Sequence, residues 1–524
     1  IPWLSSAGFD LDERSTGIKF ETANFQMTEL SSDRSQQPEC ETDMTENSTG
    51  DLRSSTSPAD SSVVGQYSEA TQADVIAAIE RARNSLTDWS SRCVTERAAI
   101  LKRAAELFEA RTAEFTSLIA KEAGRTLNDG VDEVREAVDF CRYYAAQAMS
   151  LMHSELELPG VTGETNRLSY AHRGPWLCIS PWNFPLAIFT GQIVANLAVG
   201  NTVIAKPAEQ TPLVAQLACD VLKEAGVPEG VLNLVNGDGP TLGSWLLHDE
   251  RIAGVSFTGS HPSARVINRQ LASRDGPIIP FIAETGGINC MVVDSTALPE
   301  QVVDDVITSA FRSAGQRCSA LRVLFVQSDV ADGIIELLSG AMKELNVGDP
   351  HKLSTDVGPV IDQAAHDRIS AHLTHLKETA TFIAKSPSPD PELNGYFVEP
   401  QAWEIASLSA LREEVFGPIL HIVRYHSEDL DSIIKDIRSS KFALTMGIHS
   451  RLKGLHERLA REHLVGNLYI NRDTVGAVVG SNPFGGHGLS GTGPKAGGPN
   501  YLRQLVVEHT VTDNVTALGG NTEL

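Results

Sequence analysis

The fold is decided by one stretch, Trp176–Lys206, which reads WLCISPWNFPLAIFTGQIVANLAVGNTVIAK. Two short apolar runs, WLCIS and TVIAK, have the length of buried strands, and a helix is predicted between them over 186–198. The alternation continues downstream with a helix over 212–225, the strand VLNLVNG, a helix over 241–248 and the strand GVSFTG. Strands that alternate with helices are typical of a parallel sheet, so we expect a doubly wound α/β domain.

A second α/β block follows the first. Its predicted elements are the strand CMVVD, a helix over 299–312, the strand LRVLFV, a helix over 330–344 and strands around HIVRY, ALTMGIHS and NLYINR. Before the first block, apolar residues at helical spacing predict helices over 73–89, 94–120 and 131–152. A polar hairpin or edge strand is expected near Gly160–Tyr170, and the C-terminal LRQLVVEHTVTD has the pattern of a strand.

Length and composition limit the class of protein. The 524 residues suggest two or three domains at about 100–200 residues each, and 41% hydrophobic with 21% charged residues is ordinary for a soluble protein. The net charge of −24 argues against nucleic acid and anionic membranes as partners. No apolar run approaches the roughly 20 residues of a membrane span, so we expect a cytoplasmic protein.

The seven cysteines are scattered and include no CxxC pair. This pattern predicts free thiols in a reducing compartment and no zinc or other metal site. The chain begins with Ile1 instead of methionine, which predicts a fragment or a processed piece of a longer protein. Residues 27–62 are dense in Ser, Thr, Glu, Asp and Gln, so we expect an arm or a disordered segment there and ordered structure from about Pro58.

One cysteine has unusual neighbours. Cys318 lies in AFRSAGQRCSAL, Ala310–Leu321, behind a glycine and an arginine. A lone cysteine is most often a small buried hydrophobe, and the other six fit that description. A turn with a guanidinium or a helix N-terminus beside the sulfur would instead favour the thiolate, so a nucleophile and a buried thiol remain equal alternatives on the residues alone.

Two further polar residues lie in uncommon surroundings. Glu284 stands in AETGG, where glycines would let its carboxylate swing, although a solvated or helix-capping acid fits equally well. Asn183 stands in ISPWNFP between aromatics and prolines, either walling a pocket or in a buried turn. A thiol, an amide and a carboxylate together can attack a carbonyl, hold the oxyanion and activate water.

A nucleotide crevice is indicated although the chain lacks GxGxxG. Lys206 ends the strand TVIAK and Glu209 follows it, which suits ribose hydroxyls at a strand's carboxyl end, or equally a capping pair. Ser260 in GVSFTGS could offer a hydroxyl and backbone N–H groups to a pyrophosphate, or only join a strand to a helix. A carboxylate at 209 would repel a 2′-phosphate, which favours NAD over NADP.

Taken in order, these motifs resemble the aldehyde dehydrogenase superfamily from about Pro58 to the C-terminus. The closer likeness is to the L-glutamate γ-semialdehyde (pyrroline-5-carboxylate) dehydrogenase half of bifunctional proline utilization A flavoproteins. The stretches that carry it are SAGFDLDER, AETGGINCMVVDSTALPEQVVDDVITSAFRSAGQRCSALRVLFVQ, LSTDVGPVID and VGAVVGSNPFGGHGLSGTGPKAGGPNYL. Ile288 in GGIN departs from the polar residue expected there, and the segment after Met27 is longer than the family pattern.

The resemblance implies an α/β aldehyde dehydrogenase fold and a catalytic cysteine. Cys318 would be the nucleophile, its own N–H and the Asn183 amide the oxyanion hole, and Glu284 the base that activates water. The positions implied for NAD binding are Ile179, Ser180, Pro181, Trp182, Lys206, Glu209, Gly239, Gly259, Ser260, Glu414 and Phe416. The positions implied for the substrate are Ser319, Gly476, Ala477, Phe184, Phe311 and Glu136.

The same resemblance implies the domain boundaries and partners. They are an N-terminal arm over 1–57, an NAD-binding domain over 58–286 interrupted by an oligomerisation hairpin at about 153–172, a catalytic domain over 287–496 and a C-terminal oligomerisation strand and tail over 497–524. It implies at least a homodimer. SAGFDLDER resembles the piece that follows a proline dehydrogenase barrel, so fusion to or cooperation with such an enzyme is expected.

The expected activity is oxidation of L-glutamate γ-semialdehyde to L-glutamate, the second step of proline catabolism. Three alternatives remain open. The substrate could be another ω-semialdehyde, such as succinylglutamate semialdehyde. The chain could be a cofactor-free cysteine hydrolase, in which His487 or His261 would have to reach Cys318. It could also be a catalytically silent scaffold on the same fold, which the intact Cys318, Glu284 and Asn183 argue against.

Overall fold

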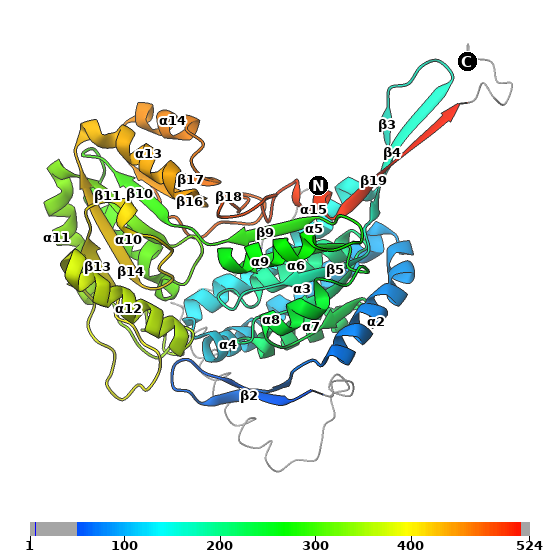
Figure 1. The fold of residues 1–524 in the computed structure, drawn as a ribbon, viewed down its shortest axis with the longest axis horizontal. Helices are drawn as coiled ribbons and strands as arrows, with labels where there is room; N and C mark the ends of the chain where they lie inside the picture. The colour runs from blue at the N-terminus through cyan, green and yellow to red at the C-terminus, as the bar shows by residue number, and fades with distance from the viewer. Residues whose placement is uncertain (1–5, 7–49, 515–524) are drawn as a thin grey trace.

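A computed structural model of the chain describes Ser6 and residues 50–514, in which two sheet-centred units lie side by side (Figure 1). The SAGFDLDER segment beyond Ser6 and the Ser- and Thr-rich residues up to 49 lie outside the described residues. A narrow three-stranded sheet projects from the unit on the right of Figure 1. The two units and this projection account for the α/β architecture expected from the sequence.

The first unit is built on a five-stranded, fully parallel sheet with the order β7-β6-β5-β8-β9. Its strands are β5 (Pro175–Ile179), β6 (Thr202–Lys206), β7 (Leu232–Leu234), β8 (Gly254–Gly259) and β9 (Phe281–Thr285). Strand order reverses beside β5, the first strand of the stretch quoted above. The doubly wound sheet predicted from the sequence is confirmed.

Helices cover both faces of this sheet, because successive side chains of a strand point to opposite sides. Trp176 and Cys178 of β5 pack in a cluster with five helices, whereas Leu177 packs with the other three. The five are α3 (Val94–Ala110), α4 (Thr112–Ala123), α5 (Leu127–Met152), α6 (Ala187–Ala198) and α7 (Pro212–Ala225). The three are α2 (Gln72–Ser91), α8 (Gly239–Leu246) and α9 (His261–Ala272).

The second unit has a seven-stranded sheet with the order β12-β13-β14-β11-β10-β16-β17, parallel except for the pair β12–β13. Its strands are β10 (Asn289–Val293), β11 (Leu321–Gln327), β12 (Thr381–Lys385), β13 (Gln401–Glu404), β14 (Ile419–Tyr425), β16 (Thr445–His449) and β17 (Asn467–Ile470). Its helices are α10 (Pro299–Phe311), α11 (Ser328–Glu344), α12 (Gln363–Thr379), α13 (Leu430–Ser440) and α14 (Lys453–Arg461), with the 3-10 turns η1 (Arg312–Gly315), η2 (Leu408–Ala410) and η3 (Ser427–Asp429).

Three small sheets complete the described chain. The projecting sheet has the order β19-β4-β3, from β3 (Leu156–Leu158), β4 (Glu164–His172) and β19 (Val506–Asn514). The other pairs are β1 (Leu52–Thr56) with β2 (Val63–Ser68), and β15 (Phe442–Ala443) with β18 (His487–Gly488). The short helix α15 (Tyr501–Gln504) leads into β19. No helix of the described residues is both long and apolar enough to cross a bilayer.

Several predicted boundaries were wrong. The single helix expected over 94–120 breaks at Arg111, whose φ of −102° and ψ of 22° end α3, and α4 runs on to the left-handed Gly124. Helix α5 begins at Leu127, four residues earlier than expected, where the Thr126 side chain caps it by accepting a hydrogen bond from the Asp129 N–H. Strand β1 begins before Pro58. The elements β12, α12, β13, α13 and α14 were not predicted at all.

Candidate active site

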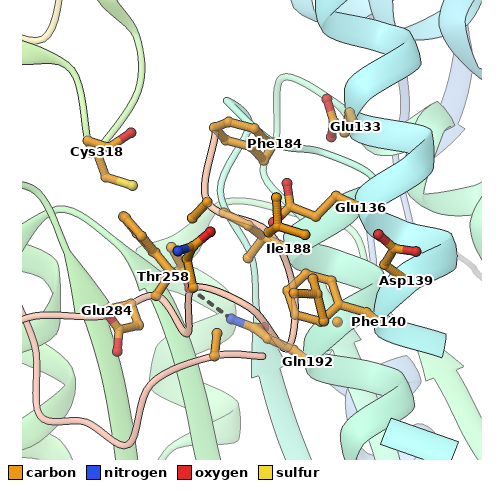
Figure 2. A pocket seen from close by; sticks show the side chains of 18 of the residues that line it. Glu133, Glu136, Asp139, Phe140, Phe184, Ile188, Gln192, Thr258, Glu284 and Cys318 are labelled. Carbon is orange, nitrogen blue, oxygen red and sulfur yellow. Dashed lines mark hydrogen bonds between the residues drawn. The ribbon is translucent and has the colours of Figure 1, made fainter. Parts of the chain in front are cut away.

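One cavity of about 340 Å³ brings together residues that are far apart in the sequence (Figure 2). It is lined from the first unit by α5, α6 and the ends of β8 and β9, and from the second by the Cys318 loop and residues 476–484. Seven of the residues predicted for catalysis or substrate binding line it: Cys318, Glu284, Ser319, Gly476, Ala477, Phe184 and Glu136. The cavity therefore lies where the two units meet.

Cys318 lies in the turn between η1 and β11, and its sulfur points into the cavity (Figure 2). It is partly exposed, whereas four other cysteines are buried in the cores and Cys93 is exposed on the surface. The buried four are Cys141, Cys178, Cys219 and Cys290. Among the cysteines that the structure describes, Cys318 alone lines this cavity.

Buried side chains hold the backbone around Cys318. The Asn289 amide donates to the carbonyl oxygens of Cys318 at 2.6 Å and of Ala320 at 2.9 Å. The Thr474 hydroxyl donates to the Ser319 carbonyl at 3.0 Å. Because each bond satisfies a carbonyl that would otherwise be buried without a partner, the loop has little freedom to move.

A buried guanidinium supports the other side of this loop. Arg322 is 1% exposed and donates to the carbonyl oxygens of Gly315 at 2.7 Å and Arg317 at 3.0 Å. It also pairs with the Glu414 carboxylate at 3.1 Å and lies 5.3 Å from the centre of the Phe416 ring. Arg322 thus ties the Cys318 loop to two of the residues predicted to meet the cofactor.

The environment of Cys318 disfavours its thiolate in this structure. Burial, then the nearby carboxylates of Glu414, Glu284 and Glu136, raise the pKa of the thiol to about 12. The thiol is therefore protonated at neutral pH, and a positive charge brought close to the sulfur would favour the reactive form.

Asn183 lies between β5 and α6 and is 8% exposed. Its side-chain amide donates to the Gln316 carbonyl at 3.0 Å, two residues before Cys318. A side-chain NH₂ group has two donors, so one N–H remains for an oxygen bound near the sulfur. The structure thus brings the amide beside the Cys318 loop, as an oxyanion-hole residue requires.

Glu284 is near the end of β9, and its carboxylate points away from Cys318 (Figure 2). Its Oε2 atom accepts a 3.4 Å bond from the Gly486 N–H, and its Oε1 atom has no partner. Glycines lie beside this carboxylate, which leaves no room for larger residues. A Cβ at Gly485, for example, would lie only 2.7 Å from Oε1. Burial is the main reason that the pKa of Glu284 lies well above its usual value, which is the property of a general base for neutral pH.

The predicted adenosine-ribose contacts lie at the carboxyl end of β6. Lys206 pairs with the Glu209 carboxylate at 2.9 Å, and the same oxygen accepts a bond from the Gly239 N–H at 2.6 Å, where α8 begins. The carboxyl edge of a parallel sheet is where nucleotides bind in doubly wound folds. The donor set of a lysine, a carboxylate and a helix start therefore fits the ribose end of a dinucleotide.

The other predicted cofactor positions follow the same edge of the sheet. Gly259 ends β8, and the Ser260 hydroxyl caps α9 by accepting a bond from the Ser263 N–H at 3.2 Å. The remaining positions are at the end of β5 or just after it: Ile179, Ser180, Pro181 and Trp182. The Trp182 ring meets Phe416 edge-on at 5.6 Å between centroids. This edge runs from the ribose contacts to the Cys318 cavity.

The end of the cavity formed by α5 combines aromatic walls with several carboxyl groups, of which Glu136 is the one predicted to meet the substrate. Burial and the neighbouring Glu133 raise the pKa of Glu136 to about 8, so this group is largely protonated at neutral pH unless a cation pairs with it. Phe311 was predicted as a wall but does not line this cavity. It is fully buried at the end of α10 and lines a separate hollow beside α5. Ile288 is 7% exposed in the core of the second unit.

Two absences in the described part of the chain bear on the alternatives. No histidine lines the Cys318 cavity, so neither His261 nor His487 is placed to activate the thiol. No group of three or more His, Cys, Asp or Glu side chains is arranged to hold a metal ion. A histidine-activated cysteine hydrolase is therefore not supported.

Sequence reasoning missed the side chains that support the site: Asn289, Arg322, Thr474 and Asp129. Each is buried and bonds to the Cys318 loop or the turn before it. The available signal was a polar residue beside an apolar run, as for Asn289 before CMVV and Arg322 within LRVLFV. A buried polar group of this kind must find partners, although the sequence does not say which.

Comparison with known proteins gives consistent matches. The aldehyde dehydrogenase family matches residues 44–511. The bifunctional protein PutA of Klebsiella aerogenes is 47% identical over 87% of this chain, which spans about a third (34%) of that protein. A 1-pyrroline-5-carboxylate dehydrogenase of Geobacillus thermodenitrificans is 36% identical over 89% of this chain and 90% of its own length. The solved structure of a point mutant of the Thermus thermophilus 1-pyrroline-5-carboxylate dehydrogenase has a TM-score of 0.91 at 30% identity, covering 98% of this chain and 99% of that one.

Proposed function

The chain belongs to the aldehyde dehydrogenase family, and from this we propose that it oxidises L-glutamate γ-semialdehyde to L-glutamate with NAD. Enzymes of the family use NAD or NADP. The observation that carries the proposal is the shared cavity, in which the Cys318 thiol, the Glu284 carboxylate and the Ser319–Gly476–Ala477 substrate end meet. The names of the relatives at 36% and 47% identity support this choice of aldehyde.

In the proposed reaction the Cys318 thiol loses its proton to solvent, and the resulting thiolate attacks the aldehyde carbon. The side-chain amide of Asn183 and the backbone N–H of Cys318 hold the oxygen as it becomes negative, and losing one such donor typically costs about 3–4 kcal/mol. NAD held by the residues at the carboxyl edge of the five-stranded sheet would supply the hydride acceptor and the positive charge of its nicotinamide ring. Loss of the hydride leaves a thioester on Cys318, and Glu284 then takes a proton from the water that releases the acid.

The residues at the substrate end of the cavity favour an amino acid aldehyde as the substrate. Gly476 has a φ of +73° and no side chain, so a carboxylate could approach its backbone and that of Ala477. Glu136 would become charged beside the substrate ammonium, because an opposite charge counteracts the effect of burial on its pKa. A succinylated amine has no positive charge to meet Glu136, which disfavours that alternative.

We favour NAD over NADP because of Glu209. Its carboxylate is part-exposed beside Lys206, where a 2′-phosphate would meet a like charge. Replacing Glu209→Gln should narrow the preference for NAD over NADP by about tenfold, which corresponds to roughly 1.4 kcal/mol. The ratio of kcat/KM for the two cofactors measures it, and an unchanged ratio would place the ribose elsewhere.

The direct test follows NADH absorbance with glutamate semialdehyde and NAD. The unmodified chain should produce NADH, and Cys318→Ala should not. The Cys93→Ala variant is the matched control, because that thiol is exposed on the surface and should leave the rate unchanged. No NADH from the unmodified chain would refute the proposal, and NADH with succinylglutamate semialdehyde alone would favour the second substrate.

We also propose that the chain is a dimer through the projecting sheet. Leu156, Leu158 and Val507 lie on its strands and are 55%, 36% and 38% exposed, which is a costly arrangement for apolar side chains in water. The projecting sheet also has a long exposed strand edge, and such an edge is commonly covered by a second chain. Light scattering should give a mass of at least two chains, and a monomeric mass would contradict it.

A further inference from the structure

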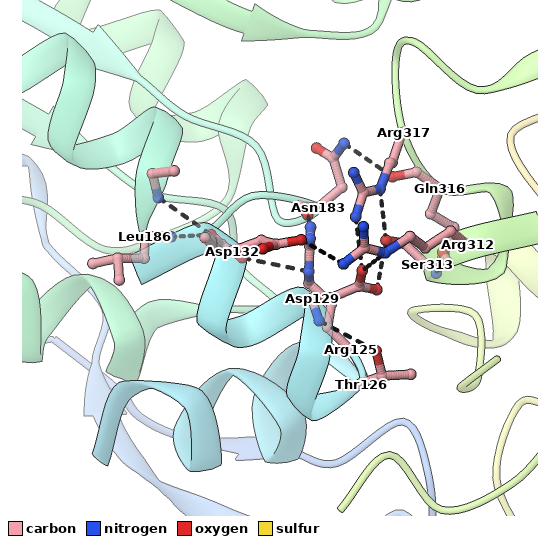
Figure 3. A network of polar contacts seen from close by, with 12 residues as sticks. Arg125, Thr126, Asp129, Asp132, Asn183, Leu186, Arg312, Ser313, Gln316 and Arg317 are labelled. Atoms are coloured by element: carbon pink, nitrogen blue, oxygen red, sulfur yellow. Dashed lines mark hydrogen bonds and ion pairs between the residues drawn. The ribbon is translucent and has the colours of Figure 1, made fainter. Parts of the chain in front are cut away.

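Asp129, in the first turn of α5, is a fully buried carboxylate that joins the two units (Figure 3). Its Oδ1 atom accepts bonds from Arg317 at 2.7 Å and pairs with Arg312 at 2.7 Å. Its Oδ2 atom accepts a bond from the Ser313 hydroxyl at 2.7 Å. All three partners belong to the second unit and directly precede Cys318, whereas α5 belongs to the first.

The turn that Asp129 holds is an unfavourable one. Ser313, Ala314 and Gly315 have φ values of 56°, 53° and 66°, which are left-handed conformations that residues with a Cβ rarely adopt. Arg317 also donates to the Ser313 hydroxyl at 2.8 Å, so the hydroxyl, the guanidinium and the carboxylate form a closed triangle. Strained backbone persists only where surrounding contacts hold it, and Asp129 supplies these contacts from the first unit, whereas Arg322 of the second unit bonds to the Gly315 carbonyl.

The same helix also holds the segment that carries Asn183. Arg125, just before α5, donates to the Asn183 carbonyl and pairs with Glu133 at 3.4 Å. Glu133 in turn accepts bonds from the N–H groups of Leu186 at 2.7 Å and Ala187 at 3.2 Å, at the start of α6. The N-terminal end of α5 therefore holds two loops that come from different units. One loop carries Cys318 and the other carries Asn183.

The carboxylate is charged under ordinary conditions. Burial by itself would raise the pKa of Asp129, but the guanidinium groups of Arg317 and Arg312 hold it below its usual range. An amide at this position would keep the shape but could not balance two cations. Removing only the charge thus tests the network without opening a cavity.

We propose that Asp129 is a positioning residue for Cys318. It fixes the left-handed turn and the Arg317 side chain across the boundary between the units, and it thereby sets where the sulfur stands relative to Asn183. The inference rests on the proposed role of Cys318 as the nucleophile. A shift of about 1 Å in a reacting atom can lower a rate by roughly 10²-fold, so a residue remote from the substrate can control the reaction.

The test compares Asp129→Asn with Glu122→Gln. Glu122 is also a fully buried carboxylate with three donors, but it caps α7, and its partners are Ser55, Leu213 and Val214 instead of the Cys318 loop. In Asp129→Asn the first-turnover rate of hydride transfer should fall about 10- to 100-fold with little change in KM for NAD. Glu122→Gln should leave that rate within about twofold, even if its melting temperature falls.

Alkylation with iodoacetamide gives a readout that does not depend on the aldehyde. Freed from Asp129, the Cys318 loop should let its sulfur reach solvent, so the alkylation rate of Cys318 relative to exposed Cys93 should rise at least threefold. Peptide mass spectrometry follows both thiols in one sample. The four buried cysteines report on unfolding, because they react only if the cores open.

An unchanged hydride-transfer rate, or an unchanged ratio of Cys318 to Cys93 alkylation, in folded Asp129→Asn would overturn the proposal. If the buried cysteines of that variant react, Ser313→Ala decides, since it keeps every charge and removes only the hydroxyl from the triangle. Hydride transfer in Ser313→Ala should then fall about threefold or more, and an unchanged rate would again overturn the proposal. If the unmodified chain produces no NADH, the alkylation ratio still tests the positioning role.

Discussion

The Cys318 loop and the strand end that carries Glu284 line the same cavity but are held in opposite ways. Asn289, Thr474 and Arg322 bond to the backbone on both sides of Cys318 at 2.6–3.0 Å. The Glu284 carboxylate has one 3.4 Å bond to a backbone N–H and one oxygen without a partner, among glycines. One group is fixed and the other has room to turn.

The difference follows from what each group must do in the proposed reaction. The nucleophile needs one position, because attack on the aldehyde depends on the distance and the angle of approach. The base acts later, on a water molecule, and a carboxylate beside the sulfur from the start would disfavour the thiolate. Glycines at 485 and 491 leave space beside the carboxylate, which could move between the two stages.

The largest effect should come from replacing Glu284, the proposed base. Glu284→Gln keeps the shape of the side chain but cannot take a proton, so the thioester should accumulate. We expect the first turnover of NADH to persist while steady-state turnover falls about 10²–10⁴-fold. Rapid-mixing absorbance separates the two phases. Equal loss of both phases would show that Glu284 is needed before the hydride leaves.

Removing a bond that holds the Cys318 loop should lower the rate of the first turnover. Asn289→Ala leaves the Cys318 and Ala320 carbonyl oxygens and the Thr445 N–H without their partner. We expect the first-turnover rate to fall about 10- to 100-fold and the free energy of unfolding to fall by about 3 kcal/mol. Asn346→Ala is the control, an exposed asparagine that bonds the Ser354 carbonyl, and should cost about 1 kcal/mol or less. A normal first turnover in Asn289→Ala would mean that the loop does not need this support.

The pH dependence should distinguish the two groups without a mutation. The base must be deprotonated to act, and the pKa of Glu284 is raised, so below that pKa the rate of thioester hydrolysis should rise about tenfold per pH unit. Steady-state rates over a pH series that extends down to the usual pKa of a glutamate measure it, on an unmodified chain whose hydrolysis is rate-limiting. In Glu284→Gln the slope should disappear. A flat profile for the unmodified chain would remove Glu284 as the base.

The smallest effect should come from filling the space beside Glu284. In Gly485→Ala the new Cβ would lie 2.7 Å from Oε1, so the carboxylate must leave its observed position. We expect steady-state turnover to change roughly three- to tenfold while the first turnover stays normal. Gly454→Ala, which has open space around it, is the control. No change in Gly485→Ala would mean that the observed position of the carboxylate plays no part in turnover.

The pattern of the sequence was enough to predict the architecture and the principal site candidates. Apolar runs of strand length between helical segments gave the parallel sheet around β5 and β6, because both faces of such strands are buried. Cys318, Glu284 and Asn183 were singled out because each has glycines, prolines or charges as neighbours in the sequence, and the resemblance to a family then implied their roles. The break at Arg111 and the elements around α12 were missed, because both depend on contacts between distant segments.

The sequence by itself determined the alternation of strands and helices and the chemical groups available, since both depend on residue type and near neighbours. Only the tertiary structure decided which groups share the cavity, because it is formed where two units meet. It placed Phe311 in a core, left His261 and His487 outside the cavity, and joined Asp129 to Arg317 across 188 positions of the chain. Such contacts are set by packing over the whole fold, which no local pattern encodes.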